Sequence, residues 1–293
     1  MHYYGLLSIA LNMDTFKKFD IRVFDAFIEK FAKKYVELRT TFLQGSLDEL
    51  FKAAESIGTG FELSQIKTII TKNSVFTDSL REQLKQPAVF KDIFRSDLGE
   101  LLTTYYFEEK TDSTERFIIP LKNISSRERY DMPGRGMDVI GYRISEDGQV
   151  NILIGEAKVS QEKNNPPSVV DSADDSIYRT QKEYHDNQAI IAQRLTDYLR
   201  KLNPSSDDAV AIMCAIISIN DKNTEKYTIT YGCGLVRDYT CVKEQEDYGK
   251  MQKRKEDFKP GDIRFAIFSF MNKTIEETIT DFYNKVQELK NES

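Results

Sequence analysis

The chain has 293 residues, and its 41 Lys and Arg against 47 Asp and Glu give a formal net charge of −6. A composition of 40% hydrophobic and 30% charged residues is that of a soluble globular protein. The net charge excludes an overall basic surface for nucleic acid, so any such contact must be local or shared with a partner. No apolar stretch approaches the ~18 residues of a membrane helix, and Met1 to Asp20 lacks a signal-peptide pattern, so we expect a cytoplasmic protein with no membrane contact.

The cysteines are too few and too irregularly spaced for a metal site or a disulfide framework. Cys214, Cys233 and Cys241 show no Cys-x-x-Cys spacing and lie in or beside apolar runs. We therefore expect buried free thiols rather than a zinc site.

Residues 1–86 are predicted to form a mostly helical segment. Apolar residues recur there at three- and four-residue steps, which is typical of one face of an amphipathic helix: Phe24, Phe27, Phe31, Tyr35 and Leu38. The segment contains no catalytic constellation. It is therefore the expected docking surface for a partner, with packing on the rest of the chain as the alternative.

Residues 87–293 are predicted to form an α/β domain. Its first helix starts at Pro87, continues to about Tyr105, and carries Gly99-Glu100 in its middle. Glu100 lies beside the apolar stripe of this helix. It is either a boundary residue capped by water or a lysine, or a carboxylate that faces a metal ion.

Two apolar runs, Val139 to Ile144 and Val150 to Ile154, are separated by Ser145-Glu146-Asp147-Gly148. The Asp-Gly step is a strong turn signal, so the runs are predicted to pair as a hairpin. Asp138 opens the first run, and Gly155-Glu156-Ala157-Lys158 closes the second. Because side chains alternate along a strand, Glu156 and Lys158 project from one side, and the hairpin would bring Asp138 beside them.

This set of residues suits phosphodiester hydrolysis. Asp and Glu oxygens are ligands for Mg²⁺, with Mn²⁺ as an alternative, and the ion would neutralise phosphoryl charge and activate water. Lys158 would orient or deprotonate that water, or stabilise charge in the transition state. The alternative is a structural ion pair, because Glu-x-Lys or Asp-x-Lys recurs at Glu108, Asp257 and Glu288. Those triplets lie in charged stretches, whereas Glu156 and Lys158 end an apolar strand, where unused charges are unfavourable.

The rest of the chain predicts the elements that enclose this site. A polar linker from Ser160 to Asp175 would lie next to it. The pattern then predicts a helix from Ile177 to Leu202, a buried central strand from Ala209 to Ile219, and three closing elements: strands Tyr227 to Val236 and Ile263 to Phe270, and a helix from Ile275 to Leu289. His185 is expected to be a surface or hydrogen-bonded residue, since no second internal histidine could share a metal.

A basic cluster leads into the proposed site. Arg127, Arg129 and Arg135 immediately precede Asp138 and are the candidates for contact with nucleic-acid phosphates.

The order helix with Glu100, strand opening at Asp138, strand ending Glu156-Ala157-Lys158, then helix and strand resembles the core of the PD-(D/E)XK nuclease superfamily. Three motifs, Gly99-Glu100-Leu101-Leu102, Arg135-Gly136-Met137-Asp138 and Gly155-Glu156-Ala157-Lys158, resemble those of the family containing the HamA-type nuclease subunit of Hachiman anti-phage defence systems. No proline precedes Asp138, which departs from the superfamily pattern.

The resemblance implies a restriction-endonuclease-like core with a mixed central sheet flanked by helices. It implies a Mg²⁺-dependent DNase that acts with a helicase subunit and is restrained by it, with Asp138, Glu156 and Lys158 as the catalytic core and Glu100 as a fourth member. Asp138, Glu156 and Glu100 would be the metal ligands. Two alternatives stay open: a restriction-type endonuclease with its own sequence specificity, and a catalytically silent nuclease-like module that docks a helicase.

Overall fold

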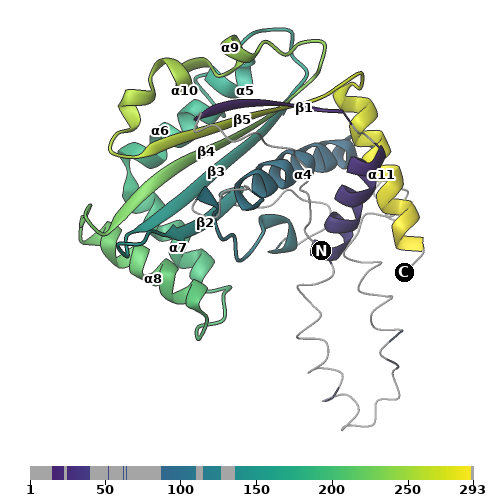
Figure 1. Ribbon diagram of the computed structural model, residues 1–293. Helices are drawn as coiled ribbons and strands as arrows, with labels where there is room; N and C mark the ends of the chain where they lie inside the picture. The colour runs from purple at the N-terminus through teal and green to yellow at the C-terminus, as the bar shows by residue number, and fades with distance from the viewer. Residues whose placement is uncertain are drawn as a thin grey trace. The chain divides into compact units, whose positions relative to one another are not determined.

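Figure 1 shows a computed structural model of the protein, which describes residues 15–22, 25–39, 52, 62, 64, 87–109, 115–126 and 136–291. The chain divides into two compact units. The first comprises Met1–Arg22, Leu98–Lys122 and Gly136–Ile275, and the second Val23–Asp97, Asn123–Arg135 and Glu276–Ser293.

The first unit is built on one five-stranded sheet with the order β1-β5-β4-β3-β2 (Figure 1). Four strands are parallel, and only β2, at one edge, is antiparallel to its neighbour. This arrangement confirms the predicted mixed α/β sheet. The strands are β1 (Phe16–Ile21), β2 (Val139–Ile144), β3 (Val150–Ser160), β4 (Tyr227–Arg237) and β5 (Asp262–Phe270).

The predicted hairpin is formed by β2 and β3. Val139 pairs with Gly155 and Ile144 with Val150, in antiparallel register. Gly148 has a φ of +81°, a left-handed conformation that glycine adopts without a steric penalty, and its N–H donates to Ser145 O at 2.9 Å. The Asp147-Gly148 step thereby fixes the register of the strands that carry the candidate site.

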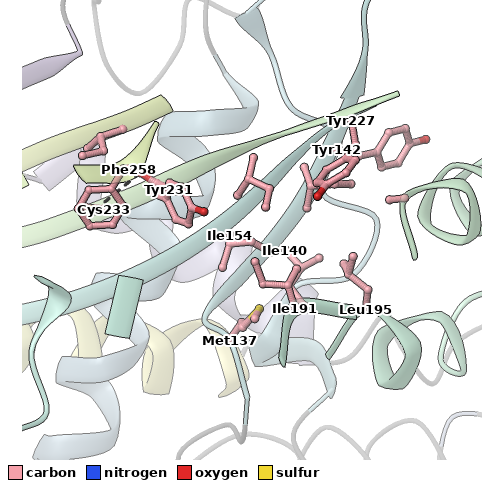
Figure 2. Packing of buried hydrophobic residues seen from close by; sticks show 14 of the residues in the cluster. Met137, Ile140, Tyr142, Ile154, Ile191, Leu195, Tyr227, Tyr231, Cys233 and Phe258 are labelled. Atoms are coloured by element: carbon pink, nitrogen blue, oxygen red, sulfur yellow. Dashed lines mark hydrogen bonds between the residues drawn. The ribbon is translucent and has the colours of Figure 1, made fainter. Parts of the chain in front are cut away.

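Helices α6 (Ile177–Asp186), α7 (Gln188–Leu199) and α8 (Asp207–Asn220) cover one face of this sheet. Figure 2 shows Ile140 and Ile154 of the hairpin gathered with Ile191 and Leu195 of α7 in one buried cluster. Ile154 shares its strand face with Glu156 and Lys158, so the apolar core leads directly to the charged end of β3.

Helix α4 (Pro87–Glu108) packs on the other face of the sheet through glycines. A Cβ at Gly99 would lie 3.0 Å from Val159 Cγ2, and a Cβ at Gly234 of β4 would lie only 1.8 Å from Thr103 Oγ1. The absence of side chains at these points lets the helix approach the strands closely. This close approach places Glu100, the neighbour of Gly99, against the sheet.

The predicted helix from Ile177 to Leu202 is in fact two helices. Asn187, with φ −132° and ψ 76°, interrupts it between α6 and α7. Asparagine is a poor helix former because its side chain competes with the backbone for hydrogen bonds, which accounts for the break.

The prediction of a buried strand from Ala209 to Ile219 was wrong, because this run forms helix α8. A short apolar run does not distinguish strand from helix by periodicity. Two helix start signals favour the helix over the strand. Ser206 Oγ accepts a hydrogen bond from Ala209 N at 3.1 Å and so caps the helix. Asp207 and Asp208 occupy the first turn, where the helix dipole favours acidic side chains.

Because residues 209–219 form a helix rather than a buried strand, Cys214 is not buried as expected. Cys214 lies on the outer face of α8 and is exposed, with Val210, Met213 and Ile217 exposed beside it. Cys241 is half-buried, and only Cys233 is buried. The expectation of burial therefore holds for Cys233 alone.

Strand β1 was not predicted from the sequence. It pairs with β5 in parallel, Phe16 opposite Phe265 and Ile21 opposite Phe270. Charged residues such as Lys17, Lys18 and Asp20 obscure its pattern, and such residues are typical of edge strands.

The second unit is held together by aromatic rings. The predicted amphipathic helix is present over residues 25–39, while Phe24 lies outside the described residues. Its Tyr35 contacts Phe94 of α4 and Phe282 of α11 (Ile275–Asn291), each with ring centroids 5.4 Å apart. Arg39 Nη1 donates to Ile124 O at 2.9 Å and so anchors the short η2 (Asn123–Ser126). Helix α11 confirms the helix that was predicted from Ile275 to Leu289.

Short helical turns complete the first unit between the strands. They are α5 (Ser168–Asp171), α9 (Glu244–Asp247), α10 (Gly249–Lys253) and η3 (Lys255–Phe258). In the described part of the chain, no helix combines the length and apolarity needed to cross a bilayer.

The close packing of α4 on β4 yields a stability prediction. Gly234→Ala should lower the free energy of unfolding by about 1–3 kcal/mol, because the new methyl group would overlap the buried Thr103 side chain. Adding Thr103→Ala should recover part of this loss, since it removes the atoms that are overlapped. Denaturant unfolding of both variants measures the effect; equal stability of Gly234→Ala and the parent chain would contradict the packing.

Candidate functional site

The candidate site lies where β2 begins and β3 ends. Gly155 permits this meeting, because a Cβ there would lie 2.6 Å from Val139 Cβ. Asp138, which precedes Val139, is partly buried, and its Oδ2 accepts a hydrogen bond from Ala157 N at 2.8 Å. The hairpin therefore brings Asp138 beside the Glu156-Ala157-Lys158 segment, as the sequence predicted.

Glu156 and Lys158 form an ion pair on the face of β3 that also carries the apolar core. Lys158 Nζ lies 3.1 Å from Glu156 Oε1, and Glu156 is only 8% exposed. Lys158 Nζ also lies 2.8 Å from Oδ1 of Asp175, which follows α5 and precedes α6. The lysine is thus bound by two carboxylates at once.

Glu100 is buried on α4, which packs on the opposite face of the sheet. It acts electrostatically on Asp138, which stands at the sheet edge. The pKa of Asp138 is therefore affected by one carboxylate from each face of the sheet, Glu156 and Glu100.

Negative charge is concentrated at the site. Burial raises the pKa of Asp138 well above its ordinary value, and Glu156 and Glu100 raise it further against the opposing effects of Ala157 N–H and Lys158. Burial also raises the pKa of Glu156, although Lys158 counteracts it. Both shifts have causes that a bound cation would oppose.

Lys158 is held in its protonated form. Burial alone would lower the pKa of its ammonium group, but Glu156 and Asp175 together outweigh that effect and raise the pKa. In this arrangement the lysine is a charged hydrogen-bond donor rather than a base. Of the roles predicted for Lys158, this arrangement therefore disfavours deprotonation of the water, while orienting the water and stabilising charge stay predictions.

Sequence reasoning missed two residues of α6 that border the site. Gln181 is fully buried, and its Nε2 donates to Ile154 O at 3.2 Å and Gly232 O at 2.9 Å. Burial, followed by the charges of Glu156 and other groups including Asp138, raises the pKa of Tyr184 to about 12, so its hydroxyl remains a hydrogen-bond donor. Only tertiary packing brings both residues to β3.

Asp175 was also missed as a site residue. It ended the predicted polar linker, and nothing in its local sequence signals a contact with Lys158, 17 residues earlier. The linker was nevertheless predicted to lie next to the site.

The remaining candidates have different outcomes. His185 is hydrogen-bonded as predicted, with Nδ1 3.0 Å from Asp186 Oδ1 and Nε2 3.2 Å from Lys259 O. Cys233 pairs with Glu156 across the β3–β4 ladder, and burial, then Glu156, raises the pKa of its thiol, so it is an unreactive neighbour. Arg127, Arg129 and Arg135 lie outside the described residues.

The donor set fits a hard divalent cation. Asp138 and Glu156 offer carboxylate oxygens in a setting whose buried negative charge a cation would compensate. No group of three or more His, Cys, Asp or Glu side chains is arranged to hold one ion within the described ranges. Mg²⁺ commonly uses one or two carboxylates and completes its shell with water and substrate phosphate, so two carboxylates suffice. Glu100 as a third ligand stays a prediction.

Fold and site together define an α/β protein with a carboxylate–lysine cluster at the end of a hairpin in a mixed sheet. The HamA family model matches residues 24–286, nearly the whole chain. The chain therefore belongs to the HamA family, the Hachiman defence subunit. No significant match was found among curated proteins or among solved structures.

The raised pKa of Asp138 predicts how pH affects stability. The folded state binds this proton more tightly than the unfolded chain, so the associated stability is greatest below the ordinary carboxyl pKa of about 3.9 and falls as pH rises through the raised value. Asp138→Asn has no carboxyl group to ionise at this position, so it does not lose stability in this way as pH rises. Its side-chain oxygen can still accept the hydrogen bond from Ala157 N. With a chelator present, its Tm should exceed that of the parent chain by a margin that grows from about pH 4 to about pH 8.

The exposed Asp257→Asn is the control and should show no such trend. A Tm difference for Asp138→Asn that is constant with pH would contradict the buried, repelled carboxylate.

Proposed function

We propose that this protein is a metal-dependent DNA endonuclease, the effector of an anti-phage defence system, which acts with a helicase subunit and is restrained by it. The observation that carries the proposal is the meeting of Asp138, Glu156 and Lys158 at one strand end. Membership of the HamA family supports the defence role. The likeness to PD-(D/E)XK nucleases, seen in the order of the motifs, supports the reaction type.

Each residue has a distinct part in this proposal. Asp138 and Glu156 would hold Mg²⁺ or Mn²⁺, which supplies neutralisation of phosphoryl charge and a more acidic water. Ala157 N–H fixes the Asp138 carboxylate through Oδ2. Lys158 donates to a phosphoryl oxygen and stabilises the negative charge that develops as the water oxygen bonds to phosphorus and the P–O bond to the sugar breaks. Glu100 adds negative charge that strengthens cation binding.

The charge of the chain favours a division of labour. With a net charge of −6, the protein should bind free DNA weakly and lose it as salt rises, because few phosphates can be neutralised. Arg127, Arg129 and Arg135 are the proposed local contacts. A helicase subunit would supply the remaining affinity and bring DNA to the site, and residues 1–86 are its proposed docking segment.

The proposal predicts the effect of removing the cluster. Glu156→Gln and Lys158→Ala should each lower cleavage of plasmid and linear DNA by at least about a hundredfold, since each removes a group that binds the ion or stabilises charge. Glu100→Gln should lower cleavage less. Glu225→Gln, an exposed residue before the start of β4 and so at the opposite end of the strands, is the matched control and should leave it unchanged.

Cleavage is measured with Mg²⁺, with Mn²⁺ and with chelator, in the presence and absence of the helicase subunit. A fully active Lys158→Ala protein would contradict the catalytic assignment. Defined fragments with the chain alone would favour a restriction-type endonuclease. Binding to the helicase without cleavage under any condition would favour the silent docking module.

A further inference from the structure

Lys158 is bound by two carboxylates of different character. Glu156 lies on the same strand and is buried, whereas the side chain of Asp175 is 83% exposed. Yet the exposed carboxylate makes the shorter contact, 2.8 Å against 3.1 Å from Nζ to the nearest oxygen. An ion pair with one partner in water is weak, so Asp175 can be exchanged for a stronger anion.

The backbone beside Asp175 is firmly held. The next residue, Ser176, caps α6: its Oγ accepts from Arg179 N at 3.3 Å and donates to Ser172 O at 2.8 Å. Ile177 follows and is fully buried. The Asp175 side chain can therefore leave Lys158 by rotation about its own bonds, without disturbing the cap or the start of α6.

We propose that Asp175 is a positioning residue that occupies the anion-binding position on Lys158 until the phosphate of a phosphodiester displaces it. This inference rests on the proposed function and extends it to a residue outside the Asp138, Glu156 and Lys158 cluster. Glu156 remains paired with Lys158 throughout, and the ammonium exchanges one exposed oxygen partner for another.

Two physical arguments support the exchange. Asp175 is an anion already in contact with the Lys158 ammonium at 2.8 Å, so it competes with a phosphate for the lysine charge. Its negative charge also repels an approaching phosphate at short range. While the site holds no substrate, Asp175 keeps the long, flexible side chain of Lys158 in one orientation.

The test uses Mn²⁺ and bis-para-nitrophenyl phosphate, a small phosphodiester whose hydrolysis is followed by colour and which needs neither a helicase nor a DNA-binding surface. Asp175→Asn should lower KM by roughly twofold to fivefold and leave kcat within about twofold, because a competitor for the phosphate position is lost. Asp175→Glu keeps the competing charge and should resemble the parent chain.

Asp174→Asn is the matched control. Asp174 adjoins Asp175, its side chain is 98% exposed, and it pairs with Arg179 at 3.4 Å rather than with Lys158. Asp174→Asn removes the same charge from the same loop as Asp175→Asn. Any fall in KM that comes from the change in net charge alone therefore appears in both variants. Equal KM values for Asp175→Asn and Asp174→Asn, with an active parent chain, would overturn the role of Asp175 and leave the proposed function standing.

A second measurement needs no turnover. Acetylation of Lys158 by an amine-reactive ester, followed by mass spectrometry, should be faster in Asp175→Asn than in the parent chain or Asp174→Asn, since the ammonium loses its outer partner. Equal acetylation rates in all three would overturn the inference. Failure of every variant to hydrolyse the diester would overturn the proposed function and this inference with it.

Discussion

The close approach of β2 to β3 at Gly155 is the constraint on which the site depends. A methyl group at that point would collide with Val139, so a glycine there lets the antiparallel edge strand lie tightly against its neighbour. Asp138 is then near enough to accept the Ala157 N–H. Without this approach, the edge strand would carry its carboxylate away from Glu156 and Lys158.

Helices that pack on the two faces of the same sheet bring the charged groups of the site together. α4 brings Glu100 through the contact that Gly99 permits, and α6 lies over the face that carries Glu156 and Lys158. The Lys158 ammonium group acts on both Asp138 and Glu156 and lowers the pKa of each. Among the described residues, the site therefore gathers carboxyl groups around the Lys158 ammonium group, which is the electrostatic setting expected of a cation site.

Much of this arrangement could be predicted from the sequence because its signals are local. The Asp147-Gly148 turn, the strand alternation and the charged end of an apolar run predict the hairpin and the order of Asp138, Glu156 and Lys158. α8 was misread because an apolar run carries no period, although Ser206 and the two following acids mark a helix start. Asp175, Gln181 and Tyr184 could not be assigned to the site, since only the tertiary packing of α6 and its preceding loop brings them to β3.

The central claim is that the carboxylates at this strand end hold a divalent cation. The most direct measurement is electron paramagnetic resonance of Mn²⁺ titrated into the isolated chain, which separates bound from free ion without requiring DNA, a partner or turnover. The account predicts bound Mn²⁺ in the parent chain and its loss in a double variant with Asp138→Asn and Glu156→Gln. Equal binding of Mn²⁺ by the parent chain and the double variant would contradict it.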